Sequence, residues 1–441
     1  MNQLRQFVTA RPGLSLLLLA LLVRLAALAA DPASLQAPLV KDSGFYHGLA
    51  VELASGRGFS EEGRPTARVS PLYPLFLAGV YLAFDYSRLA VLLCQVALGA
   101  LTVLYLFFLG GEVFSRRVAV LAAAAAAVYW PLIAVGTRLL SEPLFIALLV
   151  ASGYHTVRVF KYKRPGQAAC AAALTGLAVL TRPVVLYFSA VVALWLVRDF
   201  FRGRDKAAVS AAALYLGVLV LVQVPWVVRN CVVMGHFIPT STASGAVLYS
   251  GNMPRQGKIF GYNLREHELD PEERYILGLP EVEQDKALRR LAVEGLKKKP
   301  PAEWVRLFSL KLLFFWMPFD WEVLGHPEGI FNPWFFLVFL FALVWLSRLK
   351  WQEDYFYLAA IVVYFTLICL VAYGSPRMRL PIEPFLLVFA AAGWQELEPR
   401  WPGRHKYLTG MVILAVLTAG RLCGEQLKEA ARVLAGWLGI W

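Results

Sequence analysis

Charged residues are scarce in this chain. Asp, Glu, Lys and Arg make up 17% of its 441 residues, whereas soluble domains hold about 25%. Hydrophobic residues reach 59% and recur in long runs along almost the whole length. This scarcity excludes an ordinary soluble protein and predicts a polytopic membrane protein, so the usual estimate of domain number from length does not apply.

Cysteine chemistry and nucleotide-driven transport also lack their sequence signatures. The five cysteines are odd in number and form no CxxC, which is neither a disulfide framework nor a zinc site. No GxxxxGK[ST] motif is present, so no P-loop couples this chain to a nucleotide. Any chemistry must therefore come from groups near the membrane surface.

Positive charge is abundant, with a formal net charge of +13. Nucleic-acid binding does not explain it, because the basic residues lie in short loops between apolar runs, as in the positive-inside pattern. The loops at 116–117, 158–164, 198–206, 348–350 and 400–406 are therefore predicted to be cytoplasmic. We expect membrane lipids, and no nucleic acid, as partners of the basic residues.

The apolar runs predict an all-α integral membrane protein, a bundle of about 11–13 transmembrane helices. The expected spans are 12–30, 88–110, 118–136, 139–157, 167–181, 184–197, 207–228, 333–347, 355–373, 381–396 and 407–421. The fifth and sixth are short and meet at a polar kink, Thr181-Arg182-Pro183. The first could also be a cleavable signal peptide, because Arg5 and Arg11 precede it and ALAAD ends it; the many later spans favour a retained helix.

The loop charges place two long polar segments, 31–87 and 229–332, outside the cytoplasm. The runs 71–84, 309–319 and 422–441 are predicted to lie at the membrane surface as interfacial helices. We therefore expect an N-terminal transmembrane module, 1–230, with a first external loop at 31–87. An extracytoplasmic loop, 231–332, and C-terminal transmembrane helices with an interfacial tail, 333–441, complete the predicted organisation.

Charged residues stand at the outer ends of several predicted spans. They are Asp42, Arg138, Glu142, Arg182, Arg377 and Arg379. Charges at membrane depth usually pair or line a wet cavity, so these residues predict a polar pocket. A carboxylate there can deprotonate a hydroxyl, and arginines can hold a phosphate.

Each of these residues also has a simpler explanation. Asp42 could be a solvated residue outside its span. Glu142 could pair only with Arg138, four residues before it. The arginines could anchor lipid headgroups.

The order of the motifs is more specific than any one residue. Asp42 and Tyr46 precede GRGF, SPLYPLFLAG, LLSEPLF, GLAVLTRP, VPWVVRN with a later SGN, and SPRMRLPIEP. This succession, over roughly residues 10–395, resembles the bacterial GT-C glycosyltransferases related to protein O-mannosyltransferases and the lipid A aminoarabinose transferase.

The resemblance implies a GT-C type bundle with juxtamembrane helices on the extracytoplasmic face of the bacterial cytoplasmic membrane. Such enzymes transfer a sugar, usually with inversion, from a polyprenyl-phosphate-linked donor to an extracytoplasmic acceptor. It matches Asp42 to the catalytic base and Glu142 to a second acidic residue, which could orient the acceptor or share a divalent cation (Mg or Mn) with Asp42. Tyr46, Tyr73, Arg138 and Asn252 are the expected substrate-binding residues.

Two departures from the family pattern bear on the site. Ser43 follows Asp42 where mannosyltransferases have a second acidic residue. The run Arg68-Val-Ser-Pro71 replaces a Lys-Pro-Pro element, so Arg68, Arg182, Arg377 and Arg379 are the candidates for binding the donor phosphate. The alternative to a transferase is a lipid-linked sugar flippase or a secondary transporter, although no internal repeat is visible.

Overall fold

A computed structural model of the chain describes residues 11–36, 38–39, 41–203, 206–253, 271–320, 330–349 and 352–397. Helices dominate these residues, which confirms the predicted all-α class. The strands among them form two short antiparallel pairs, β1 (Ser60–Glu61) with β2 (Arg64–Pro65) and β3 (Phe319–Asp320) with β4 (Ile330–Phe331).

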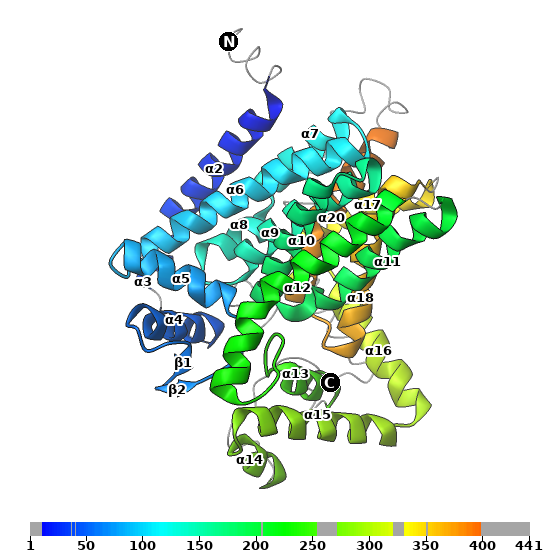
Figure 1. Cartoon of the computed structure of the whole chain (residues 1–441). Helices are drawn as coiled ribbons and strands as arrows, with labels where there is room; N and C mark the ends of the chain where they lie inside the picture. The colour runs from blue at the N-terminus through cyan, green and yellow to red at the C-terminus, as the bar shows by residue number, and fades with distance from the viewer. Residues whose placement is uncertain are drawn as a thin grey trace.

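In the first half of the chain, the helices pass back and forth between the two ends of the molecule (Figure 1). Its helices are α2 (Pro12–Ala30), α3 (Ala33–Gln36), α4 (Lys41–Ala54), α5 (Leu72–Ala83), α6 (Arg88–Val113), α7 (Arg116–Val128), α8 (Trp130–Ala134) with the 3-10 turn η1 (Val135–Thr137), α9 (Glu142–Tyr162), α10 (Pro165–Thr181) with η2 (Pro183–Val185), α11 (Leu186–Gly203) and α12 (Lys206–Met234).

The second half adds a helical cluster at the same end as α4 and then returns into the bundle (Figure 1). Its elements are α13 (Ser244–Asn252), α14 (Pro271–Leu277), α15 (Glu281–Lys298), α16 (Pro301–Trp316), α17 (Pro333–Ser347), η4 (Glu353–Tyr355), α18 (Phe356–Val371), α19 (Pro376–Arg379), η5 (Leu380–Ile382) and α20 (Glu383–Leu397).

The helices have the lengths and compositions of membrane spans. Among the described residues, five are long and apolar enough to cross a membrane, and the bent pair α7–α8 would make six. Four shorter apolar helices coincide with α5, α10, α11 and α17. The total of 11–13 spans stays a prediction, since 407–421 and the interfacial tail 422–441 lie outside the described residues.

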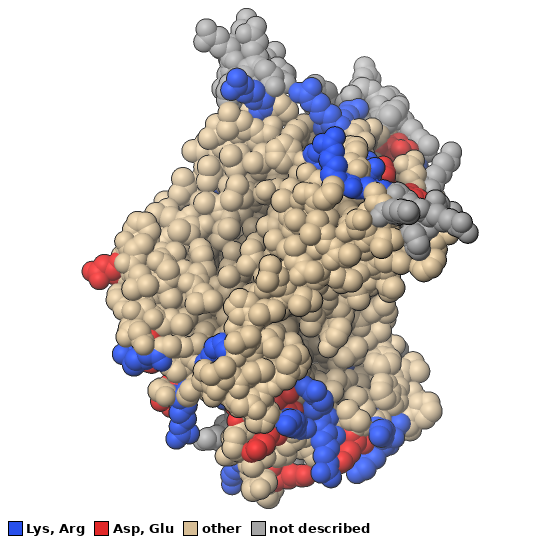
Figure 2. Space-filling model, viewed as in Figure 1, with Lys and Arg blue, Asp and Glu red and all other residues tan. Residues whose placement is uncertain are grey.

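The distribution of charged residues also fits helices that cross a membrane. Figure 2 shows Lys, Arg, Asp and Glu gathered mainly at two opposite ends of the molecule, with a broad belt of other residues between them on this face. Such a belt lies in the hydrocarbon when helices cross a bilayer. The structure thus has the form of a multi-pass membrane protein.

The predicted third span is broken. Its two parts, Arg116–Val128 and Trp130–Thr137, are bent by 52°. Pro131 explains the break, because proline has no N–H to donate to the carbonyl of Ala127, four residues earlier, and its ring would clash with that carbonyl in a continuous helix. Arg24, which is 3% exposed, donates from Nη1 to the carbonyl of Ala127 (3.1 Å) and from Nη2 to that of Ala126 (3.3 Å). It thereby satisfies carbonyls at the end of α7, where a cation is favourable.

The first external segment is more ordered than the loop we predicted. Residues 41–54 form α4, so Asp42 lies in the first turn of a helix. In the GRGF stretch that follows, Gly56 and Gly58 have φ values of 76° and 77°. These values suit glycine because it has no Cβ to clash.

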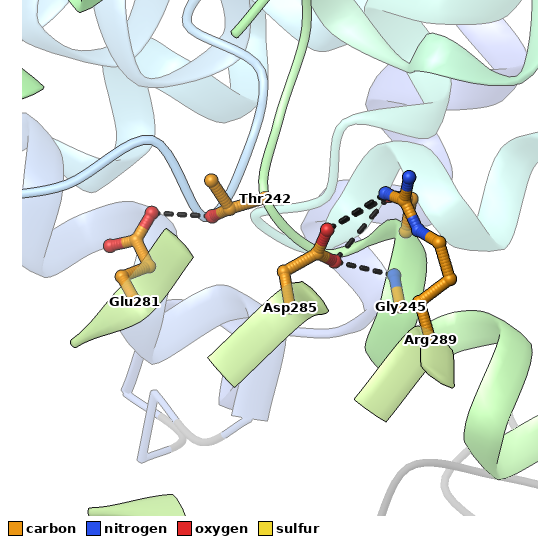
Figure 3. A network of polar contacts seen from close by, with 6 residues as sticks. Thr242, Gly245, Glu281, Asp285 and Arg289 are labelled. Atoms are coloured by element: carbon orange, nitrogen blue, oxygen red, sulfur yellow. Dashed lines mark hydrogen bonds and ion pairs between the residues drawn. The ribbon is translucent and has the colours of Figure 1, made fainter. Parts of the chain in front are cut away.

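A carboxylate at the start of α15 binds the segment just before α5. Glu281 accepts hydrogen bonds from Thr66 Oγ1 (2.6 Å), from Ala67 N (2.9 Å) and from Thr242 Oγ1. One turn later, Asp285 binds the start of α13 and Arg289 (Figure 3). The start of α15 therefore contacts both the segment before α5 and the segment that leads into α13.

We predict that Gly393→Ala destabilises the bundle. The added Cβ would lie against the carbonyl oxygen of Phe341, so α17 and α20 would have to separate. Overpacking of this kind costs about 1–3 kcal/mol. Gly217→Ala is the matched control, because a Cβ there meets nothing within 4 Å. Thermal unfolding in detergent measures both; equal melting temperatures would contradict the packing argument.

Candidate active site

Four charged side chains form one continuous chain of ion pairs. Arg377 Nη1 lies 2.7 Å from Asp42 Oδ2, and Arg377 Nε lies 2.5 Å from Glu142 Oε1. The same Oε1 lies 3.0 Å from Arg182 Nη1. The order Asp42–Arg377–Glu142–Arg182 alternates in sign, and we call these residues the four-charge chain.

Each member of the four-charge chain stands where a helix begins or ends. Asp42 is in the first turn of α4, and Glu142 is the first residue of α9, where the helix dipole favours a negative charge. Arg182 is extended between α10 and the Pro183 turn, and Arg377 lies in the short α19. Only the fold brings these ends together, because Arg377 and Glu142 are 235 residues apart.

The two carboxylates have different environments. The Glu142 side chain is fully buried at 0% exposure, whereas that of Asp42 is 48% exposed. Burial would lower the pKa of Arg377, but the charges of Glu142 and Asp42 outweigh it and raise that pKa well above its usual value. Arg377 therefore stays charged, Glu142 holds both arginines, and Asp42 is the more accessible of the two carboxylates.

Two buried atoms of the four-charge chain have hydrogen-bonding capacity left. Within the part of the chain that the structure describes, Glu142 Oε2 and Arg377 Nη2 have no hydrogen-bond partner. Buried polar atoms of native proteins are nearly always paired, so such atoms point to a ligand or water. Arg377 Nη2 suits an anion.

Two aromatic residues predicted to bind substrate, Tyr46 and Tyr73, lie beside the four-charge chain. Tyr46 is one turn after Asp42 on α4, and its hydroxyl lies 3.4 Å from Ser141 Oγ, next to Glu142. The rings of Tyr46 and Tyr73 meet edge to face, with centroids 4.9 Å apart. Burial raises the pKa of Tyr46, so its phenol stays protonated and able to donate.

The simpler explanation of Glu142 is wrong. Its ion pairs are with Arg182 and Arg377, and not with Arg138 four residues earlier. Arg138 is half-buried, and its carbonyl accepts a hydrogen bond from Gln95 Nε2 (2.6 Å). Its place in the sequence is beside the site, and its role in substrate binding stays a prediction.

Three other predicted residues are engaged elsewhere in the fold. Arg68 pairs with Glu61 at 3.2 Å. Arg379 is fully buried and donates to Glu383 Oε1 and to carbonyls of the segment after α16 and its last turn. Asn252 donates to two carbonyls and accepts from Lys311. No interaction among the described residues joins these three to the four-charge chain, so they fit structural roles better than the predicted ones.

Sequence reasoning missed Gln95 and Lys311, both buried polar residues in apolar helices. Lys311 Nζ donates to Asn252 Oδ1 and to the carbonyl of Leu370, both at 2.7 Å. It thereby ties α16 to α13 and α18. The signal that could have found both is a lone polar residue inside an otherwise apolar run.

A divalent cation shared by Asp42 and Glu142 does not fit the arrangement. The guanidinium of Arg377 lies between the two carboxylates and binds both. Elsewhere in the described ranges, no group of three or more His, Cys, Asp or Glu residues could hold a metal ion.

Comparison with known proteins gives a partial family match. The family model described as dolichyl-phosphate-mannose-protein mannosyltransferase matches residues 68–228. This range contains Tyr73, Glu142 and Arg182 but not Asp42 or Arg377. Over these residues the match confirms the resemblance to protein O-mannosyltransferases. A search of curated proteins finds no significant match.

Solved structures with a similar course of the chain are membrane glycosyltransferases. The apo oligosaccharyltransferase of Archaeoglobus fulgidus shares 13% identity, covering 96% of this chain and 56% of that one with a TM-score of 0.49. ArnT from Cupriavidus metallidurans bound to undecaprenyl phosphate shares 15% identity, covering 87% and 78% with a TM-score of 0.41. The chain spans about half the length of the oligosaccharyltransferase.

We predict that Glu142→Gln destabilises the protein far more than Asp42→Asn does. Loss of the buried Glu142 charge leaves two largely buried arginines without their shared partner, and breaking a buried pair costs about 3–5 kcal/mol. Asp42 is half-exposed, so its pair with Arg377 contributes about 0–1 kcal/mol. Thermal unfolding in detergent measures both variants. An equal loss of stability would show that the two carboxylates do not differ in the way their burial indicates.

We predict that stability rises with pH through the titration of Lys311. Burial lowers the pKa of Lys311 from 10.5 to about 8. Between these two values the unfolded chain binds more protons than the folded one, so the free energy of unfolding increases with pH. The melting temperature of the wild type should therefore rise over this range relative to Lys311→Met. Parallel curves for the two proteins would refute it.

Proposed function

We propose that this protein transfers a sugar from a polyprenyl-phosphate-linked donor to a hydroxyl group of an extracytoplasmic acceptor, with inversion at the anomeric carbon. Asp42 is the general base. The observation that carries the proposal is the four-charge chain, which ends in a half-exposed carboxylate at one side and holds two arginines around a buried one.

The reaction begins at Asp42. Its Oδ2 is bound to Arg377, and Oδ1 has no hydrogen bond among the described residues, so Oδ1 can accept the proton of an acceptor hydroxyl. The hydroxyl oxygen then bonds to the anomeric carbon from the side opposite the phosphate. The bond between that carbon and the phosphate oxygen breaks, and its electron pair leaves with the lipid phosphate.

The four-charge chain couples proton transfer to departure of the phosphate. Its two carboxylates and two arginines balance in charge before the reaction. Protonation of Asp42 removes one negative charge, which frees Arg377 Nη1 at the moment when the leaving phosphate gains a negative charge. Arg182 and Arg377, held by Glu142, can then donate to that phosphate.

The choice of donor is supported by the family match. The name of the matching family describes transfer of mannose from dolichyl phosphate to protein, and the matched range includes Glu142 and Arg182. We propose that the acceptor here is a glycolipid, a polysaccharide or a protein. The loop charges support a site on the periplasmic side of the bacterial cytoplasmic membrane.

We predict that Asp42→Asn lowers turnover by about 100-fold or more, which is the usual effect of losing a general base. The assay supplies a panel of labelled polyprenyl-phosphate sugars and an envelope extract to the protein in detergent, and measures release of lipid phosphate. Asp85→Asn is the control, because Asp85 is an exposed carboxylate that follows α5 and takes no part in the four-charge chain.

Two results would overturn the proposal. Turnover of Asp42→Asn within about threefold of the wild type would remove Asp42 as base. Movement of the labelled lipid between vesicle leaflets without release of lipid phosphate, and unaffected by Asp42→Asn, would identify a flippase instead.

A further inference from the structure

One buried amide lies behind the four-charge chain. Gln95 is the only residue with a side-chain amide in α6, and it is 1% exposed. A buried amide in an apolar helix is costly unless its hydrogen bonds are made. The partners of Gln95 therefore show what it holds together.

Gln95 bonds to two different parts of the site. Its Oε1 accepts from the hydroxyl of Tyr73 at 2.7 Å. Its Nε2 donates to the carbonyls of Gly136 (3.1 Å) and Arg138 (2.6 Å). One side chain thus connects α6 to α5 and to the end of the broken third span.

The hydrogen bond from Tyr73 to Gln95 connects Gln95 to the helix that carries Asp42. Tyr73 is fully buried, and its ring packs edge to face on Tyr46. Tyr46 and Asp42 lie on the same face of α4, because residues four apart on a helix are neighbours. The hydrogen bond from Tyr73 to Gln95 fixes the ring against which this face of α4 rests.

The hydrogen bonds from Gln95 Nε2 connect Gln95 to the backbone that leads to Glu142. The backbone from Gly136 to Arg138 leaves the 3-10 turn η1 and enters α9 at Glu142 within four residues of Arg138. Both hydrogen bonds that Gln95 Nε2 donates go to carbonyls of this segment. The 3-10 turn η1 ends at Thr137 and Arg138 is extended, so these carbonyls lie outside a regular α-helix, and Gln95 supplies a fixed partner for them.

We propose that Gln95 is a positioning residue that sets the distance between Asp42 and Glu142, and hence the placement of the base relative to the arginines. It touches neither substrate nor reacting atoms and acts through Tyr73 and the 136–138 backbone. The inference rests on the proposed function for its effect on turnover, and on geometry alone for its effect on the four-charge chain.

The kinetic test compares Gln95→Met with Thr102→Val. Methionine keeps the shape of glutamine without its hydrogen bonds, whereas Thr102 lies two turns further along α6 and bonds only to Leu98 within its own helix. Gln95→Met should lower kcat by about 10-fold to about 100-fold, as small misplacements of catalytic groups do. The donor KM should stay within about twofold, and Thr102→Val should keep the kcat of the wild type. A kcat of Gln95→Met within about twofold of the wild type would overturn the proposal.

Tyr73→Phe tests the connection through Tyr73 with a smaller change. It removes one hydroxyl and keeps the ring, so it should lower kcat less than Gln95→Met does. The double variant should be no worse than Gln95→Met alone, because the hydroxyl has then already lost its partner. If Gln95→Met does not fold, Tyr73→Phe decides: a wild-type kcat would overturn the proposal.

A cryo-EM structure of Gln95→Met, or of Tyr73→Phe if Gln95→Met does not fold, supplies a measurement that does not depend on the reaction. We expect the Arg377 Nη1–Asp42 Oδ2 pair, 2.7 Å in the wild type, to open beyond 4 Å while the helices stay in place. An unchanged pair would refute the positioning role. Wild-type protein without any transferase activity would instead refute the proposed function, and an opened pair in the variant would still support the geometric role of Gln95.

Discussion

The arrangement of this site depends on one guanidinium placed between two carboxylates. Arg377 binds Asp42 through Nη1 and Glu142 through Nε, and so joins the start of α4, the start of α9 and the short α19. A buried charge is tolerated only when it is paired and hydrogen-bonded, so loss of any one partner affects the other two. The electrostatics of Arg377 therefore constrain how three distant segments of the chain can pack.

Burial gives the two carboxylates different roles, although their chemistry is the same. Glu142 has no exposure and shares one oxygen between two arginines, which makes it a fixed counter-charge. Asp42 is nearly half exposed and has an oxygen available. Only a carboxylate that substrate can reach can take up a proton from it, and a fixed counter-charge keeps the arginines oriented before the reaction begins. The environment, and not the residue type, distinguishes the proposed base from the residue that holds the two arginines.

The sequence predicted the helices of the bundle better than the contacts between them. Apolar runs with clear ends gave the spans 12–30 and 333–347 at the bounds that the structure has, because a membrane span requires an unbroken apolar stretch. The prediction also put Asp42, Glu142 and Arg182 at the ends of spans; the structure joins Asp42 to Glu142 through Arg377 and pairs Glu142 directly with Arg182.

The failures have a common physical origin. Pairing of Glu142 with Arg138 was a local inference from helical spacing, whereas the actual partners come from segments far away in the sequence. The third span was predicted as continuous because its composition is apolar throughout. Pro131 breaks it, because proline cannot donate the hydrogen bond that a continuous helix would need at that position. Gln95 was missed because one amide scarcely changes the hydropathy of a long helix.

The segment 41–67 is held by two sets of contacts, and these explain how the exposed Asp42, the proposed base, can also be well placed. On the membrane side, Gln95 fixes Tyr73, on which Tyr46 of α4 rests. On the outer side, Glu281 of α15 binds Thr66 and Ala67 just before α5. The Asp42 side chain is 48% exposed and neither of these contacts touches it, while its helix α4 rests through Tyr46 on the fixed ring of Tyr73. General-base catalysis needs this combination, since the carboxylate must be reachable and must not have to reorganise when the proton moves.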